Sequence, residues 1–395
     1  PTSFSLNLGP LEVGISGINF GSYQREHQGV MRKYYVFGFD GALGLGPIGV
    51  EARGKGMQYF FTVDNDAANG KPAHDYFTIQ TVEVDMTIPG NATPENATAI
   101  IQGYLSIPQP GESTEYEGGV SVKLPKARIS GSAEMRLSPK YPAFLINASI
   151  GLPKPIPLGA TGLGIYGFEG LLGYRYVAEK TAINGFSGDE TWYEYMAYPP
   201  RGIDQSKFSD PEETKDYNFP FSIGAGATLA TMDDGFILST RLFLLLSLPS
   251  VFILEGKANI LSQRLDLNSD NEPPFFAFLA VGDSSIEMGL GADYQLPKSN
   301  GNIIDLYAEV QAGFFFDNPS AWYVNFGTKE KTISARLLSL LDVQAFLMLS
   351  AKGIEVGARA EFNFDKRFGP AHVKAWLYAE VGAKLSFERP QLGGY

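Results

Sequence analysis

Apolar and polar residues alternate one by one over long stretches of this chain. Between His372 and Phe387, every second residue from Val373 onward is apolar, and the residues between them include Lys374 and Glu380. Successive side chains of a β-strand point to opposite faces, so this alternation predicts a strand with one apolar and one polar face.

The same alternation recurs along most of the sequence, with turns rich in Gly, Pro and Asn between the strands. We expect an all-β fold: one large antiparallel meander with an apolar face, either closed or double-layered, as a sandwich, a barrel or a groove. The expected strands cover residues 34–39, 49–63, 77–88, 98–107, 119–124, 127–137, 143–152, 222–231, 236–248, 251–261, 275–281, 285–296, 304–315, 322–327, 332–340, 343–350, 354–365 and 373–387.

A polar stretch in the middle of the chain interrupts this pattern. It predicts three parts: an N-terminal β module over residues 1–185, a polar connecting loop over 186–220, and a C-terminal β module over 221–395. Within the loop, Ser209, Pro211 and Glu212 have the spacing of a capped helix start, which predicts a short helix there.

Composition narrows the possible functions. The 395 residues carry a net charge of −12 and no cysteine, which argues against nucleic acid as a partner and excludes disulfides and thiolate metal sites. The most hydrophobic stretch, Leu242–Leu254, is too short to form a membrane-spanning helix, and Ser247, Pro249 and Ser250 interrupt it. We expect an extracytoplasmic or surface-associated protein, without a more specific location.

Catalytic motifs are scarce. The glycine spacings at Gly44–Gly49 and Gly162–Gly167 match a dinucleotide-binding turn, but strand-like sequence rather than a helix follows each. The acids Glu309, Glu355, Glu361 and Glu380 lie on polar rows, where ion pairing across strands is expected rather than a glycosidase-like carboxyl pair. The sequence therefore predicts no enzyme activity.

Two acidic loops are weak candidates for calcium. Hard oxygen ligands cluster at alternating positions in both, as a Ca²⁺ loop requires, although Asp and Asn are also ordinary turn residues. The candidate ligands are Asp64 and Asp66 in the first loop and Asp266, Asn268 and Asp270 in the second. No other cofactor is expected, apart from a possible lipid.

The apolar rows are the candidate binding surface, because so much apolar area is not left in water. Their residues are Ile286, Met288, Leu290, Ala292, Leu306, Ala308, Val310, Ala312, Phe314, Ile354, Val356, Ala358, Ala360, Phe362, Leu377, Ala379 and Val381. Three coverings are open: the protein itself, with the polar face in solvent; acyl chains in a groove, for which the many alanines leave room; or surrounding lipid, as in an outer-membrane β-barrel.

The stretch Pro273–Leu279, its neighbouring strands and the Phe346-Leu-Met-Leu segment resemble long, β-rich, uncharacterised bacterial proteins with repeated aromatic and glycine-containing strands. The resemblance covers about the last 170 residues and implies no activity and no site residues.

A short sequence pattern that recurs at long intervals also indicates repetition. The pairs Arg136-Leu, Arg241-Leu and Arg336-Leu each precede a strand that contains a Phe-Leu-Ile-like triplet. We therefore expect a non-catalytic β-scaffold or binding protein, a module of a larger or repeated assembly, with an apolar interior for a hydrophobic ligand. Its expected partners are further copies or modules of the same kind and lipid or another hydrophobic ligand, but not nucleic acid.

Overall fold

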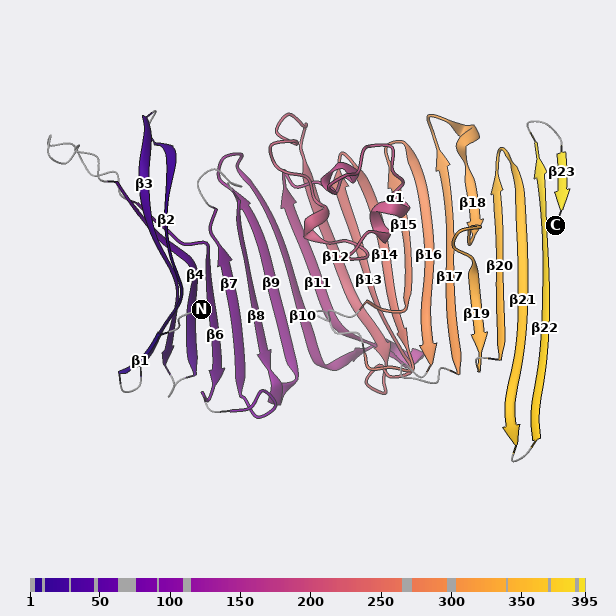
Figure 1. Ribbon diagram of the computed structural model, residues 1–395, viewed down its shortest axis with the longest axis horizontal. Helices are drawn as coiled ribbons and strands as arrows, with labels where there is room; N and C mark the ends of the chain where they lie inside the picture. Colours follow the sequence, from indigo (N-terminus) through magenta and orange to yellow (C-terminus); the bar gives the residue numbers. More distant parts are fainter. Residues whose placement is uncertain are drawn as a thin grey trace. The chain divides into compact units, whose positions relative to one another are not determined.

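The computed structural model of the chain is built almost entirely from antiparallel β-strands (Figure 1). It describes residues 4–8, 11–27, 30–45, 49–62, 76–90, 92–108, 115–264, 272–296, 303–338, 340–368, 371–387 and 391–394. These form two compact units, Pro1–Lys154 and Pro155–Tyr395, called unit 1 and unit 2 below. The predicted all-β class and the antiparallel meander are confirmed.

Unit 1 is a meander in which most strands pair with the next one along the chain. Its strands are β1 (Phe4–Leu8), β2 (Leu11–His27), β3 (Val30–Leu45), β4 (Val50–Phe61), β5 (Tyr76–Thr78), β6 (Thr81–Ile88), β7 (Ala99–Ser106), β8 (Tyr116–Leu124), β9 (Ile129–Ser138) and β10 (Ala143–Pro157), which runs past its boundary. Strand β4 pairs with β5 near one end and with β6 near the other. A 3₁₀ turn, Pro125–Ala127, joins β8 to β9.

The first two strands of unit 1 are absent from the sequence-based expectation. Strand β2 contains several glycines, which lack the side chains that carry the alternation, and its pairing with β3 shifts register between Ser16 and Asn19. Gly17 has a φ of 63° at this shift, a conformation that favours glycine. A bulge of this kind hides the strand from a strict two-residue pattern.

Unit 2 is also built from antiparallel strands (Figure 1). Its strands are β11 (Leu163–Tyr174), β12 (Phe221–Thr231), β13 (Leu238–Leu248), β14 (Val251–Ile260), β15 (Phe275–Gly282), β16 (Ser285–Leu296), β17 (Ile304–Phe315), β18 (Tyr323–Phe326), β19 (Ile333–Leu337), β20 (Leu341–Ser350), β21 (Gly353–Phe368), β22 (Ala371–Ser386) and β23 (Gln391–Gly394). The short strands β18 and β19 share one position, since both pair with β17 and with β20.

Residues 175–220, between β11 and β12, form the covering segment of unit 2. Figure 1 shows it lying over one face of the central strands. It contains the only α-helix of the described residues, α1 (Trp192–Ala197), and the 3₁₀ turns Lys180–Ala182 and Gln205–Lys207; two further 3₁₀ turns, Gly159–Thr161 and Pro319–Ala321, lie elsewhere in unit 2.

The largest fully buried side chains of unit 2 lie between the covering segment and the sheet. Tyr176, Tyr195 and Met196 come from the segment, and Leu245 and Ile253 come from β13 and β14. The Tyr193 ring packs 6.0 Å from that of Phe278 on β15. The tight core of unit 2 is therefore a layer of irregular chain packed on a sheet.

The α-helix found among the described residues is not where the sequence analysis placed it. Thr191 caps α1, and its side chain and that of Glu194 form a capping box. The predicted start at Ser209 is wrong, because the Ser209 hydroxyl accepts a hydrogen bond from the Val177 backbone N–H at 3.0 Å and the residues after it form turns. The sequence after Thr191 supplies four side chains to the core, whereas the residues after Ser209 bury only Pro211 and Thr214 and leave Glu212 and Glu213 exposed.

Candidate functional site: the apolar face of unit 2

The pairing register places all the predicted apolar residues on one face of the unit 2 sheet. Ile286 lies opposite Phe314, Leu290 opposite Val310, and Ala292 opposite Ala308. Directly paired residues of neighbouring strands share a face. The same face continues from β17 across the strands β18, β20, β21 and β22.

The face extends beyond the strands named in the sequence analysis. On β13 and β14 the same face carries Leu242, Leu244 and Leu254, which pair with one another or with Gly, Ala and Leu residues of the neighbouring strands. The further rows on β12 to β15 comprise Ile223, Ala225, Ala227, Leu229, Leu246, Leu248, Phe252, Ala258, Phe275, Ala277, Leu279 and Val281. We call this surface the apolar face.

The apolar face is the more exposed of the two in the centre of unit 2. On β16, Met288 is 42% exposed and Leu290 is 56% exposed. Glu287, the neighbour of Met288 on the opposite face, is 0% exposed. Of the three coverings left open above, shielding of the apolar face by the chain itself, with the polar face in solvent, is therefore not what these strands show. The covering segment lies on the polar face.

The apolar face also carries no charge. From β12 to β20, the described residues in its rows include no Asp, Glu, Lys or Arg. Most soluble monomers expose apolar patches of only a few hundred Å². A surface of this width and composition is typical of a contact with something equally apolar.

Carboxylates on the polar face hold the covering segment in place. Glu287 accepts hydrogen bonds from the Tyr193 backbone N–H at 3.2 Å and from the Ser285 hydroxyl at 2.9 Å. Glu255 on β14 accepts from the Ile203 backbone N–H at 3.2 Å and lies 2.9 Å from the Lys257 ammonium. Burial raises the pKa of Glu287 above its ordinary value, since the charged form loses its hydration.

Hydroxyl groups of the sheet and a glycine complete the fit. The Ser247 hydroxyl on β13 accepts from the Ala178 backbone N–H at 2.7 Å. Gly289 on β16 leaves room for α1, because a Cβ at this position would lie 2.4 Å from the Phe278 ring and 2.8 Å from the Tyr193 ring. Backbone polar groups of the covering segment thus find partners on the polar face that the apolar face does not offer.

Lys207 is buried within the covering segment itself. Its ammonium donates hydrogen bonds to the carbonyls of Tyr195, Tyr198 and Gly202, at 2.8, 2.7 and 2.9 Å. Burial lowers the pKa of Lys207 to about 8, and the nearby carboxylate of Glu255 opposes this change. These bonds close the loop that follows α1 and give Lys207 a structural role.

The acids singled out in the sequence lie in two different surroundings. Glu355 pairs across strands with Lys384 at 3.1 Å, as expected for an exposed part of the sheet, and Arg359 lies 3.0 Å from Glu361. Glu380 accepts a hydrogen bond from the Tyr378 hydroxyl. Glu309 instead lies buried beside the covering segment.

The proposed calcium ligands Asp64, Asp66, Asp266, Asn268 and Asp270 lie outside the described residues. Among the residues that are described, no group of three or more His, Asp or Glu side chains is arranged to hold a metal ion.

Comparison of the chain with protein-family models, with curated proteins and with solved structures found no match. Within the described ranges, no helix has both the length and the apolar character needed to cross a membrane. The function must therefore be argued from the two faces of the sheet.

The sequence analysis did not identify the groups that dock the covering segment. Glu255, Glu287 and Ser247 lie on the polar rows, where a carboxylate or hydroxyl is as common in solvent as under a second layer. A usable signal was the string of aromatic residues Trp192, Tyr193 and Tyr195, which is too apolar for an exposed loop.

Proposed function

We propose that this protein is a non-catalytic β-scaffold that binds the acyl chains of lipids on its apolar face. The observation that supports the proposal is that a face without charged side chains over the nine strands β12 to β20 is left half-exposed while the chain covers the opposite, polar face. Hydrocarbon is the partner that gains most from such a surface.

The composition of the face favours lipid over a second protein surface. Protein interfaces carry about one hydrogen bond per 100–200 Å² and a polar rim. In the central rows of β14, β15 and β16 the apolar face offers Leu, Ile, Met, Phe, Val, Ala and Gly, with no side-chain donor or acceptor from Phe252 to Ala258 or from Ile286 to Ala292. Acyl chains need no polar partner.

Large and small residues lie side by side on the apolar face and make its surface uneven. Leu290 is flanked on the neighbouring strands by Ala277 and Val310, and Ala292 by Phe275 and Ala308. Small residues beside large ones leave shallow channels that flexible methylene chains fill.

The length of the rows favours a second candidate, contact with the hydrocarbon core of a membrane. On β16 the uncharged row extends from Ile286 to Leu296, which corresponds to about 34 Å at ~3.4 Å per residue. The hydrocarbon core of a bilayer is about 30 Å thick. Acyl-chain binding in solution and membrane contact use the same face and differ in whether the lipid leaves the bilayer.

The pairing of β22 supports the further proposal of assembly with other copies. In the described residues, β23 pairs with β22 only from Ala383 to Ser386, while β22 begins at Ala371. The backbone groups of an edge strand are a template for another strand. Light scattering over a range of concentrations tests this: a concentration-dependent mass supports assembly, and a constant monomer mass contradicts it.

A titration with a fluorescent fatty acid and, separately, with phospholipid vesicles tests lipid binding. The Leu290→Lys substitution should weaken binding about tenfold or more, since burial of a leucine contributes ~1.5–3 kcal/mol and a charge adds to the loss. Gln295→Lys is the matched control, because it adds the same charge to the polar face of the same strand.

The two titrations separate the candidates. Binding of the free fatty acid supports the lipid-binding scaffold, while binding to vesicles alone supports membrane contact. Equal affinities for the natural chain, Leu290→Lys and Gln295→Lys would contradict both candidates.

A further inference from the structure

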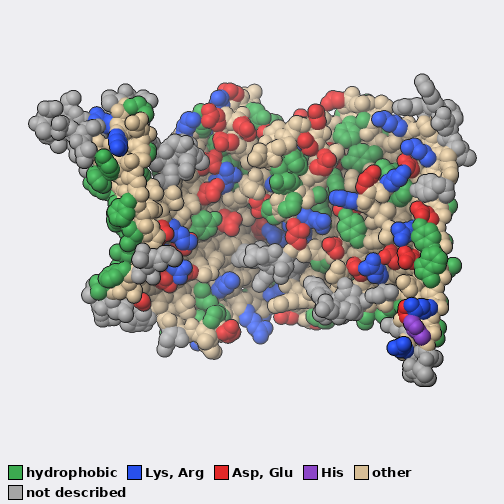
Figure 2. All heavy atoms as spheres, in the orientation of Figure 1, with side chains coloured by type: hydrophobic (Ala, Val, Ile, Leu, Met, Phe, Trp, Pro, Cys, Tyr) green, Lys and Arg blue, Asp and Glu red, His purple; other side chains and the backbone are tan. Residues whose placement is uncertain are grey.

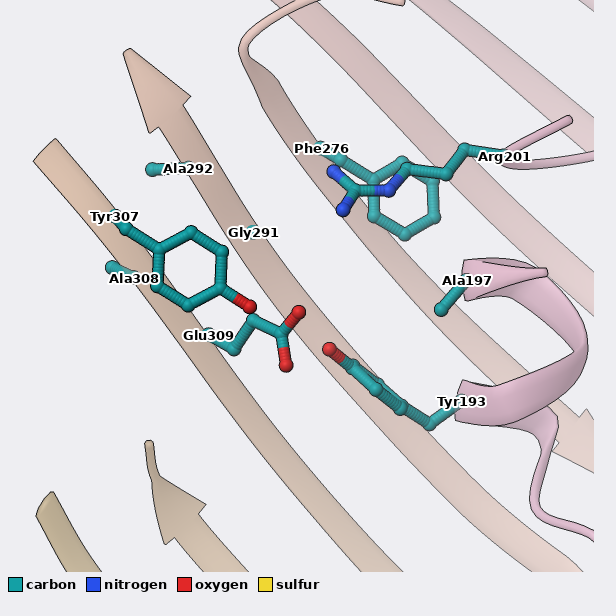
Figure 3. A pocket seen from close by; sticks show the side chains of 9 residues that line it. All are labelled: Tyr193, Ala197, Arg201, Phe276, Gly291, Ala292, Tyr307, Ala308 and Glu309. Carbon is teal, nitrogen blue, oxygen red and sulfur yellow. The ribbon is translucent and has the colours of Figure 1, made fainter. Parts of the chain in front are cut away.

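A recess at the border of the covering segment contains an unusual set of side chains. Tyr193 and Arg201 come from the covering segment, Phe276 from β15, and Tyr307 and Glu309 from β17 (Figure 3). The space between them takes about one water molecule and opens to the outside. These five side chains lie on the side of the polar face, opposite the lipid contact proposed above, while Ala292 and Ala308, which also line the recess, belong to the apolar rows.

Glu309 forms the floor of the recess. Its side chain is only 6% exposed, and its Oε2 atom is buried without a hydrogen-bond partner among the described residues. A buried carboxylate oxygen without a donor is costly, and such atoms in folded proteins are usually satisfied by a ligand, an ion or water. Of the two carboxylate oxygens, Oε2 therefore lacks a donor among the described residues, although the Tyr193 and Tyr307 phenols hydrogen-bond with the carboxylate.

The two phenols cannot supply a positive charge. Figure 3 shows the hydroxyls of Tyr193 and Tyr307 directed toward the Glu309 carboxylate. Burial, followed by the charge and hydrogen bonding of Glu309, raises the pKa of both phenols, so both remain neutral at physiological pH. The phenols therefore bring no positive charge to the recess, whereas Arg201, which also lines it, carries one.

Arg201 lies at the wall toward β15 and β16. Its Nη1 atom is 3.9 Å from the position that a Cβ on Gly291 would occupy, and its Nε atom is 3.8 Å from Glu272 Oε2. Arg201 thus forms an ion pair with Glu272, but at 26% exposure its guanidinium is partly open to solvent and can pair with a second anionic group. The recess thus places a carboxylate inside and a guanidinium nearer to the outside.

We propose that this recess binds a small zwitterion of the amino-acid class, with its ammonium group against Glu309 and its anionic group against Arg201. An ammonium group is about the size of the water molecule that the space accepts, and it donates the hydrogen bond that Glu309 Oε2 lacks. The remainder of the ligand stays at the mouth of the recess. Phe276 and Tyr307 exclude water from the sides.

Isothermal titration calorimetry with glycine, β-alanine and 4-aminobutyrate tests the proposal, with methylammonium and acetate as single-charge probes. At least one zwitterion should bind more tightly than either single-charge probe. Glu309→Gln should weaken that binding at least tenfold, while Glu361→Gln, which removes a carboxylate elsewhere on the polar face, should leave it unchanged.

A second variant keeps the proposal testable if Glu309→Gln does not fold. Arg201→Gln should weaken zwitterion binding at least tenfold and leave methylammonium binding unchanged. No heat with any zwitterion, or equal affinities for the natural chain and these variants, would mean that the recess holds water only and would overturn the proposal.

Discussion

The two faces of the unit 2 sheet differ in a way that reverses the usual rule for soluble proteins. The polar face holds Glu255 and Glu287 in nearly complete burial, while the apolar face leaves Met288 and Leu290 half-exposed. Figure 2 shows acidic and basic side chains gathered over the middle of the face in view. The difference shows that the second layer of chain packs on the face that offers hydrogen-bond partners, whereas the apolar face, which lacks such partners, is left uncovered by the chain.

The strongest test of the difference between the two faces is to truncate two neighbouring residues of β16 that point to opposite faces. Glu287→Ala should lower the free energy of unfolding by about 3 kcal/mol, because it leaves the Tyr193 N–H and the Ser285 hydroxyl without their acceptor. Met288→Ala should cost less than about 1 kcal/mol, as is usual for an exposed site. Urea denaturation measures both.

Equal losses from Glu287→Ala and Met288→Ala would contradict the assignment of the covered face. A larger loss from Met288→Ala would reverse it.

The pH dependence of the free energy of unfolding tests the same difference between the two faces. Burial raises the folded-state pKa of Glu287 above its ordinary value of 4.5. At pH values between 4.5 and this raised pKa, the folded protein therefore holds a proton that the unfolded chain has released. The contribution of this group to stability is therefore largest below pH 4.5 and falls as the pH rises through the folded pKa.

Glu287→Gln removes this titration and keeps a hydrogen-bond acceptor. The stability of the variant relative to the natural chain should rise between pH 4 and pH 7, by ~1.4 kcal/mol for each unit of pKa shift. Thermal melts across this range measure the difference. A difference that is independent of pH would show that Glu287 is not buried as described.

The smallest expected effect concerns the cap of α1. Thr191→Ala should lower the free energy of unfolding by about 1 kcal/mol, because it removes the side-chain acceptor for the Glu194 N–H. Thr191→Ser, which retains the hydroxyl, is the control and should change stability little. A loss from Thr191→Ser as large as that from Thr191→Ala would assign the effect to packing of the methyl group.

Much of the fold could be predicted from alternation. The predicted strands 285–296 and 304–315 agree with β16 and β17, and the shared face of Ile286, Leu290 and Phe314 follows from the register. The hairpins after Arg136, Arg241 and Arg336 are also present as β9–β10, β13–β14 and β19–β20. Whether these hairpins derive from one ancestral repeat stays a prediction.

Those three arginines have different ionic partners. Arg136 pairs with Glu115, Arg241 with Glu169, and Arg336 with Asp342. A recurring strand pair therefore does not bring a recurring site with it.

The covered face could not be predicted in the same way. Alternation tells which residues share a face, but which face receives a second layer depends on backbone groups far away in sequence, such as the N–H groups of Ala178, Tyr193 and Ile203. The recess at Glu309 depends on α1, whose start at Thr191 has the same capping spacing as the rejected start at Ser209. Burial of the following aromatic residues decides between them.

The central claim is that the apolar face meets hydrocarbon, and spin labels on adjacent residues of β22 test it most directly. The chain has no cysteine, so Leu377→Cys and Trp376→Cys each create a single labelling site; the two residues are 66% and 68% exposed and point to opposite faces. With Leu290→Cys on β16 as a third site, accessibility to oxygen and to a water-soluble nickel complex is measured with and without phospholipid. The account predicts that lipid shields the labels at 377 and 290 from nickel and leaves the label at 376 unchanged; equal responses at all three sites would contradict it.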